Sequence, residues 1–395
     1  MSFLPLAIAL QVSAGGQLLG VMTHENAAPG GAELAELRLV QPVLFGSAAA
    51  FAGRLQAHAM LNLEAWTLPD GQLANGNFGE GFNDRRHPHT WSHELMIAAV
   101  DAVRLPGGIR WSLAAGKGFA PFGTDDPMNR PALIYPVNHH WSQILERAVL
   151  IAGIAVGPVT LEAGLFNGDE PEHPRQWPDL GRFGDSWSVR ALVHPAAAVE
   201  LQASHASVKS PEHRGGAGLT HAKTSVSARY RRERSSGEDY ALAEWAYNSE
   251  ESFFIYRTIL LEAQLRRGRH RPYLRLEHTE RPEEARSTDL FRSPRPHFEN
   301  ATEGTSVWTV VTAGYGLGFG LQRIPARFEV VAEGGFQKVA EQGSGIFDPL
   351  TIWGRNDLWM VSVGVRITAG TPLHRMGRYG VAAGDGHHAS HQPGY

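Results

Sequence analysis

The sequence contains no cysteine among its 395 residues. This absence excludes disulfide bonds, zinc sites built from thiolates and a cysteine nucleophile. It also suits a protein that passes through an oxidising compartment such as the bacterial periplasm.

A surplus of positive charge is missing as well. The net charge is −4, and Lys117, Lys209, Lys223 and Lys338 are the only lysines. Nucleic-acid-binding proteins usually carry a basic surface, so we expect no nucleic-acid partner. The chain is 43% hydrophobic and 19% charged, a composition that excludes a disordered protein.

Long apolar runs are also absent. No stretch of about 18 consecutive apolar residues occurs, which argues against a transmembrane helix. The first residues, MSFLPLAIALQVSAGG, have a short apolar core followed by small residues but lack a basic flank. We expect residues 1–14 to be the remnant of a secretory signal or an N-terminal extension, and an ordinary first strand is the alternative.

Along much of the sequence, apolar and polar residues alternate with a period of two. In WMVSVGVRIT (359–368), the odd positions are aromatic or aliphatic and the even positions include Ser362 and Arg366. The same pattern occurs in RLQAHAMLNLEAW (54–66) and SWSVRALV (186–193), and again at 197–204, 220–232, 273–278 and 327–334. Such alternation is typical of β-strands with one apolar and one polar face.

Strand length and the rhythm of the connections favour a membrane barrel over a soluble sandwich. Many alternating segments reach about ten residues, as tilted strands that cross a bilayer do, whereas soluble strands average about 5–6. Short turns alternate with long polar loops, which lie near 67–90, 120–143, 168–184, 281–304 and 340–356. Short turns at one rim and long loops at the other are typical of a bacterial outer-membrane barrel.

We therefore predict an all-β protein, with a single closed antiparallel transmembrane β-barrel over residues 15–370, short periplasmic turns and long extracellular loops. Closure matters because an unpaired strand edge would leave backbone groups without partners in lipid. About sixteen strands are expected, within a range of fourteen to eighteen, near 17–25, 34–43, 52–66, 91–104, 109–119, 144–156, 159–167, 185–194, 197–208, 219–231, 239–248, 253–266, 271–280, 305–320, 326–339 and 357–369. Residues 371–395 lose the alternation and are rich in glycine and histidine, so we expect a flexible tail.

Several stretches of the sequence are more specific than the pattern. They follow one another as NDRRHPHTWSHELM (83–96), GFAPFGTDDPMNRPAL (118–133), NHHWSQILER (138–147), LEAGLFNGDEPEHPR (161–175), DSWSVRALVHP (185–195) and ELQASHASVKSPEH (200–213). Over residues 15–215 the chain resembles an uncharacterised family of porin-like outer-membrane β-barrel proteins of Gram-negative bacteria. The family's usual His-Pro-His-Asp ends in Thr90 here. The resemblance implies fold and an outer-membrane location, and it brings no substrate.

The polar faces of the strands are expected to line the lumen of such a barrel. We expect a porin-like channel for passive diffusion of small polar solutes, and no enzyme, because the common nucleophile, zinc-protease and P-loop motifs are absent. The expected lining residues are Gln56, His58, Asn62, Glu64, Arg110, Glu162, Arg190, Glu200, Gln202, Arg229, Arg275, Glu277, Glu329, Glu333 and Arg366.

Arginines gather on the polar faces near 229–234 and 266–275. Unpaired guanidinium groups confined in a lumen would attract anions. One alternative is a basic ring at the periplasmic rim. The other is that the arginines pair with Glu244, Glu262 and Glu277 on neighbouring strands, which would cancel that preference.

Two of the long loops are rich in metal-ligating residue types. If both fold inward, their side chains would converge, and imidazole with carboxylate suits zinc or Cu(II) whereas thioether favours Cu(I). The candidate ligands are His87, His89, His139, His140, Asp125, Asp126 and Met128. A closed barrel with a structural or metal-binding role at these loops is therefore the alternative function, although the same residues also suit loop packing or pore lining without any cofactor.

The expected environment supplies the remaining partners. Membrane lipid would contact the apolar faces, and Leu95, Ile97 and Ala99 are expected to point toward it. Acidic loops at 123–131 and 167–175 could bridge lipopolysaccharide through divalent ions, although solvated turns are the simpler interpretation. The sequence does not indicate an oligomeric state.

Overall fold

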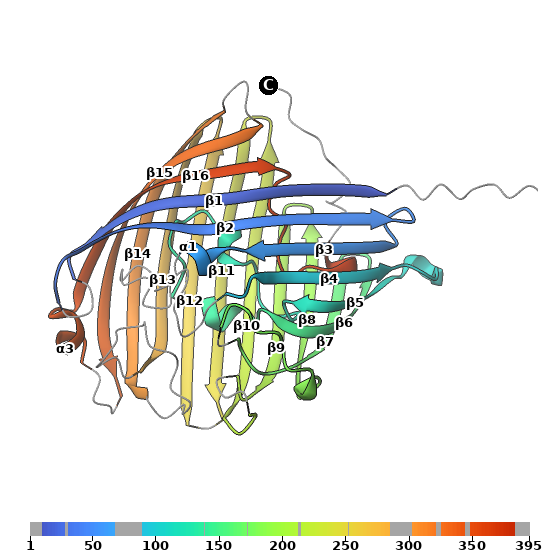
Figure 1. Ribbon diagram of the computed structural model, residues 1–395, viewed down its shortest axis with the longest axis horizontal. Helices are drawn as coiled ribbons and strands as arrows, with labels where there is room; N and C mark the ends of the chain where they lie inside the picture. The colour runs from blue at the N-terminus through green and yellow to red at the C-terminus, as the bar shows by residue number, and fades with distance from the viewer. Residues whose placement is uncertain are drawn as a thin grey trace, which may run out of the picture.

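The chain folds into a closed barrel of sixteen antiparallel strands (Figure 1). The structure is a computed structural model that describes residues 10–27, 31–67, 89–137, 139–171, 173–211, 215–251, 253–284, 302–320, 325–343 and 348–383. The predicted number of strands and the closed antiparallel architecture are confirmed.

Most strands are long enough to cross a bilayer at a tilt. They are β1 (Gln11–Glu25), β2 (Leu34–Ala50), β3 (Leu55–Asn62), β4 (Ser92–Val100), β5 (Arg110–Gly118), β6 (Arg147–Val156), β7 (Val159–Phe166), β8 (Ser186–Ala196), β9 (Val199–Lys209), β10 (Thr220–Arg234), β11 (Gly237–Glu250), β12 (Phe254–Arg267), β13 (His270–Glu284), β14 (Thr302–Gly320), β15 (Ala326–Gln342) and β16 (Asp357–Gly370). The short helices are α1 (Glu64–Thr67), η2 (Pro106–Gly108), η3 (Pro127–Asn129), α2 (His139–Ser142), η4 (Leu180–Arg182), α3 (Pro349–Trp353) and η6 (Gly380–Ala383). Among the described residues, no helix is both long and apolar enough to cross a membrane.

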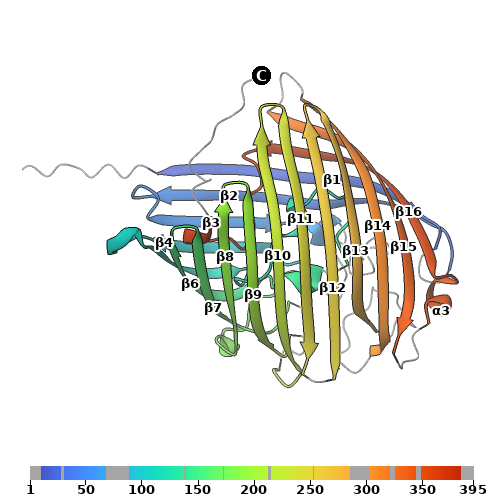
Figure 2. The ribbon, with the colours of Figure 1, turned by 180° about the vertical axis from the view of Figure 1, so that it is seen from behind.

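Pairing between the first and last strands closes the barrel. β1 pairs with β2 on one side and with β16 on the other, from Gly15 opposite Gly370 to Glu25 opposite Met360. β1 begins at Gln11, so residues 11–14 belong to the first strand and not to the extension expected from the sequence. In Figures 1 and 2, β1–β4 run across the direction of β9–β12, because tilted strands slope in opposite directions on opposite walls.

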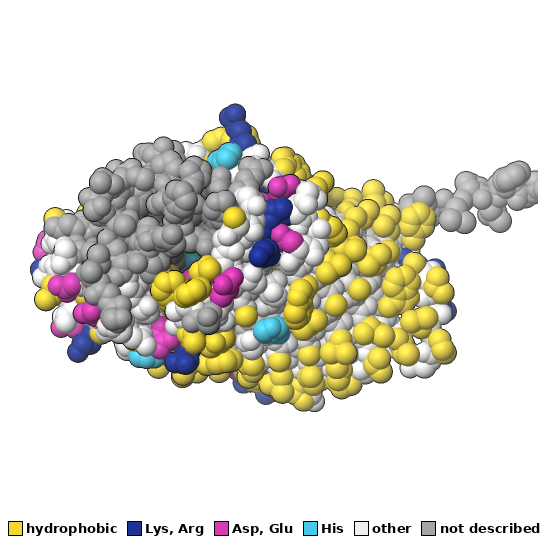
Figure 3. Space-filling model, turned by 90° about the horizontal axis from the view of Figure 1, so that it is seen from below, with side chains coloured by type: hydrophobic (Ala, Val, Ile, Leu, Met, Phe, Trp, Pro, Cys, Tyr) yellow, Lys and Arg dark blue, Asp and Glu magenta, His cyan; other side chains and the backbone are white. Residues whose placement is uncertain are grey.

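The outer face of the barrel is apolar. Along β4, Leu95 and Ile97 are exposed while Glu94 and Met96 are buried, as the alternation predicts. Along β16, Val361, Val363 and Val365 are likewise exposed. Apolar side chains form a band on the wall in Figure 3. The lipid-facing side predicted from the sequence is thus present, and it marks the part of the wall that crosses the membrane.

Two segments fold into the barrel. The lumen loop, residues 119–146 between β5 and β6, carries η3 and α2, and its residues 119–137 are buried except Asn129, which is half-buried. The C-terminal segment, residues 371–383, follows β16 and ends in η6, which packs against β4, β5, β6 and β7. The flexible tail expected from the sequence is therefore corrected for residues 371–383, because the segment is held inside the barrel.

Part of the lumen is apolar, which the sequence analysis did not anticipate. On β1–β3 the buried face carries Leu19, Val21, Val40, Val43, Phe45 and Met60. These side chains cluster with Phe119, Met128 and Leu133 of the lumen loop and with Met376 of the C-terminal segment. The two segments therefore pack on this wall by burial of apolar surface, in the way a core forms in a soluble protein.

Candidate functional site

The lumen wall carries the polar residues that the alternation predicted. Ten of the fifteen expected lining residues are buried inside the barrel: His58, Asn62, Glu64, Glu162, Arg190, Glu200, Gln202, Arg275, Glu277 and Glu333. Gln56, Arg229, Glu329 and Arg366 are half-buried, and Arg110 is exposed at the rim. A role in lining a conducting pore stays a prediction for all of them.

Arginines on the wall are paired with carboxylates. The Arg275 guanidinium donates to Glu262 at 2.7 Å, and Arg271 donates to both oxygens of Glu329 at 2.6 and 2.7 Å. Arg229 lies 3.0 Å from Asp125. At these three positions the arginines are paired with carboxylates, which is the alternative to an anion-attracting surface.

The lumen loop crosses from one wall to the other through polar contacts. Near its start, the Gly123 amide donates to the Ser204 hydroxyl of β9 at 3.0 Å. Further along, Arg130 lies 3.4 Å from Glu244 of β11. The loop is therefore anchored to strands far from the two strands that it connects.

The far end of the lumen loop is held by four charged wall residues. The Leu133 amide donates to Glu333 of β15 at 2.7 Å, and the Val137 amide donates to Glu277 of β13 at 2.7 Å. Arg275 donates to the Ile134 carbonyl at 2.9 Å, and Arg271 donates to the Pro131 carbonyl at 2.8 Å. Charged partners make stronger hydrogen bonds than neutral ones, so these contacts fix the path of the loop across the lumen.

The candidate metal ligands are used in other ways. His89 bonds to Glu64 at 2.6 Å, whereas His139 contacts the Pro136 carbonyl and lies in α2, which packs against β10 and β11. Met128 belongs to the apolar cluster of the lumen, and Asp126 accepts a bond from the Met128 amide. Within the part of the chain that the structure describes, no three His, Asp or Glu side chains are grouped to hold a metal ion, and His87 lies outside that part.

His89 and His93 each face a buried carboxylate. His89 contacts Glu64, and His93 contacts Glu146 at 2.5 Å, with the two imidazole rings 5.2 Å apart. Burial acts against protonation of His89, but the charge of Glu64 and the hydrogen bond between them outweigh it and raise the pKa of His89 to about 9. The contact between His89 and Glu64 joins the segment before β4 to α1, which follows β3.

This pair predicts a stability that falls as pH rises. A raised pKa in the folded state stabilises the protein below the unfolded value of about 6.5, and the contribution is lost as pH rises through about 9. The shift corresponds to about 3 kcal/mol at most. We expect the His89→Ala variant to be less stable than wild type at pH 6 and nearly equal to it at pH 10, measured by urea unfolding followed by tryptophan fluorescence.

A matched control for this experiment is His205→Ala. His205 bonds to the hydroxyl of Thr224 on the outer face. The gap between this variant and wild type should not close as pH rises from 6 to 10. A gap for His89→Ala that stays constant over the same range would contradict the prediction.

The C-terminal segment lies against β4, β5, β6 and β7 of the lumen wall and was missed by the sequence analysis. Its His374 bonds to Glu94 at 2.7 Å, and its Tyr379 hydroxyl donates to the same carboxylate at 2.5 Å. Although burial acts in the opposite direction, Glu94 raises the pKa of His374 above its ordinary value. The one available signal was the spacing of charged and aromatic residues in HRMGRYG (374–380), which is unusual for a loose end.

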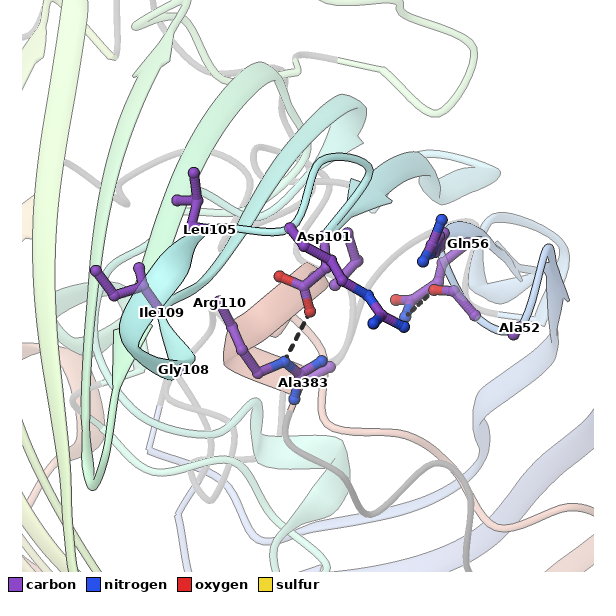
Figure 4. Close-up of a pocket in the computed structure, with 13 residues that line it drawn as sticks. Ala52, Gln56, Asp101, Leu105, Gly108, Ile109, Arg110 and Ala383 are labelled. Atoms are coloured by element: carbon purple, nitrogen blue, oxygen red, sulfur yellow. Dashed lines mark hydrogen bonds and ion pairs between the residues drawn. The ribbon is translucent and has the colours of Figure 1, made fainter.

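A pocket of about 330 Å³ opens where the C-terminal segment ends (Figure 4). Gly380 and Ala383 line it together with residues of the β2–β3 and β4–β5 turns. Across it, Arg110 donates to Asp101 at 2.9 Å. The end of the segment therefore lies at the short-turn mouth of the barrel.

No protein-family model matches the sequence, and no curated protein matches it either. The structure is similar to OmpF of Salmonella typhi in its complex with daunomycin, with a TM-score of 0.51 and 10% identity over 90% of this chain and 97% of that one. It is also similar to OmpTdeltaL8, a loop L8 deletion mutant of an outer membrane protein of Vibrio cholerae, with a TM-score of 0.50 and 10% identity over 91% and 99% of the two chains.

The anion-selective porin from Comamonas acidovorans has a TM-score of 0.49 and 11% identity over 92% of this chain and 100% of that one. The likeness to OmpF and to OmpTdeltaL8, at about 10% identity, establishes the fold, and the apolar band on the outer wall is consistent with it. The chain has the closed sixteen-stranded barrel fold that these porin structures share.

Proposed function

We propose that this protein is a channel that lets small polar solutes cross the outer membrane by diffusion, along a lumen narrowed by the lumen loop. The observation that carries the proposal is the charged and polar lining of a sixteen-stranded barrel. A barrel of this size is wide enough to enclose an aqueous passage. Charged side chains on the lumen wall that are only half-buried, such as Glu329 and Arg366, suit a lumen through which polar solutes pass.

A closed barrel with a structural role is the second candidate. It is favoured by the apolar cluster that joins Leu19 and Val40 of the wall to Phe119 of the lumen loop and Met376 of the C-terminal segment. Apolar packing of this kind stabilises a filled lumen and contributes nothing to the passage of polar solutes.

Conductance in planar lipid bilayers separates the two candidates. We expect the purified, folded protein to give discrete current steps in KCl, and protein unfolded by boiling to give none. Silence of the wild type, together with silence of folded variants in which the lumen loop or the C-terminal segment has been loosened, would contradict the channel. Elemental analysis of the same sample tests for a bound metal at the His-rich loops.

A further inference from the structure

Two arginines of the C-terminal segment meet two carboxylates of the lumen. The Arg375 guanidinium donates to both oxygens of Glu200 on β9, at 2.8 Å each, and to Asp125 of the lumen loop at 2.5 Å. Arg378 donates to the same Glu200 at 3.2 Å. This two-pronged contact is the geometry in which carboxylates recognise a guanidinium group.

The lumen wall is shaped to receive the C-terminal segment. A Cβ atom on Gly118 of β5 would lie 2.5 Å from the Tyr379 hydroxyl oxygen, and one on Gly153 of β6 would lie 2.9 Å from the Val381 side chain. Arg190 of β8 donates to the Gly377 carbonyl at 2.7 Å. The absence of side chains at these glycines creates the space in which the segment lies.

Both ends of the described C-terminal segment, residues 371–383, lie at the same mouth of the barrel. Its first residue, Thr371, donates from its amide to the Ala14 carbonyl at the short-turn end of β1, and Ala383 lines the pocket beside the β4–β5 turn. Between these points Arg375 and Met376 reach into the lumen. A segment with both described ends at one mouth can withdraw toward that mouth.

Withdrawal would leave the lumen wall with uncompensated negative charge. Four carboxylates, those of Glu94, Asp125, Glu162 and Glu200, face the C-terminal segment or the arginines that touch it. The guanidinium groups of Arg190 and Arg229 compensate two of them, and His194 lies 3.3 Å from Glu200. While the segment is in place, Arg375 and Arg378 compensate Glu200, and His374 contacts Glu94.

We propose that residues 371–383 are a plug that occupies a guanidinium-binding subsite formed by Glu200 and Asp125, and that cationic solutes carrying a guanidinium group use this subsite when the plug withdraws. The inference rests on the proposed channel function, for which it names a solute class. The proposed preference for cations is the opposite of the anion preference that the arginine content suggested, because the arginines nearest the subsite are paired with carboxylates.

The test compares full-length variants in planar bilayers. We expect Arg375→Ala/Arg378→Ala to increase the open probability at least about tenfold over wild type, since together the two changes remove both guanidinium partners of the buried Glu200 carboxylate. Arg375→Lys/Arg378→Lys, which keeps the charges but loses the forked geometry, should fall between the two. Gly118→Ala changes the wall instead of the plug, because its methyl group would displace the Tyr379 hydroxyl of the plug. It takes the place of the double variant in this test if the double variant folds poorly.

Selectivity and block test the subsite itself. In asymmetric KCl the open double variant should show a cation-selective reversal potential. L-Argininamide added on the short-turn side should interrupt its current more strongly than lysinamide, and Glu200→Gln should weaken that block. Silence of all folded variants would overturn the channel function, and the plug with it. Equal conductance of wild type and variants, anion selectivity or indifference to argininamide would overturn the plug and its subsite while leaving the channel intact.

Discussion

Replacing Glu333 with alanine should free the far end of the lumen loop and raise the conductance of the barrel. The Glu333 carboxylate accepts hydrogen bonds from the Leu133 amide at 2.7 Å and from the Tyr273 hydroxyl at 2.6 Å, and the Ile134 amide lies 3.4 Å away. Its removal leaves these donors buried without their acceptor. At about 1–3 kcal/mol for each of the two loop amides, the loss comes to about 2–6 kcal/mol of docking free energy, at least about thirtyfold in the docking equilibrium.

The matched control is Glu329→Ala, four residues earlier on β15. Glu329 also faces inward, but it accepts from Arg271 and Arg366 of the wall and reaches the lumen loop only indirectly, through the bond from Arg271 to the Pro131 carbonyl, so its loss should disturb the loop less. Single-channel recordings should show larger and noisier current steps for Glu333→Ala than for Glu329→Ala. Indistinguishable traces would mean that the lumen loop does not depend on Glu333.

The strands could be predicted from the sequence because lipid imposes a strong rule. Each segment that crosses the membrane must present apolar side chains outward, so β4 and β16 could be assigned to faces from alternation alone. On β1 and β2 alternation does not distinguish the two faces, because Leu19, Val21 and Val40 make the inner face apolar as well. The residues of the lumen loop and the C-terminal segment that pack on them lie more than 75 residues away in the sequence. Nothing in the local pattern indicates these contacts.

The contents of the lumen were harder to predict than its wall. The sequence of the lumen loop shows no alternation of apolar and polar residues, because the loop forms no strand of its own. Its backbone follows contacts with β9, β11, β13 and β15. The C-terminal segment read as a loose end for the same reason: His374 and Arg375 find their partners, Glu94 and Glu200, only after the barrel closes. The histidines of the two loops were expected to converge, but His89 takes the single carboxylate of Glu64.

The largest loss of stability is expected from Gly123→Ala in the lumen loop. Gly123 has a φ of +68°, a conformation that costs other residues about 1–2 kcal/mol. In addition, a Cβ atom there would lie 1.6 Å from the carbonyl oxygen of Ser142, so the backbone of the lumen loop would have to move. We expect a loss of about 4 kcal/mol or more, since overpacking against backbone adds to the conformational strain.

Gly157→Ala isolates the conformational part of this effect. Gly157 lies in the turn between β6 and β7 with a φ of +54°, and a Cβ atom there would meet no atom of the described residues within 4 Å. It should lose only about 1–2 kcal/mol. Urea unfolding of the two variants, followed by tryptophan fluorescence, measures the difference. Equal losses would show that the lumen loop can shift at Ser142 without cost, and the fixed path of this loop between the walls would then have to be abandoned.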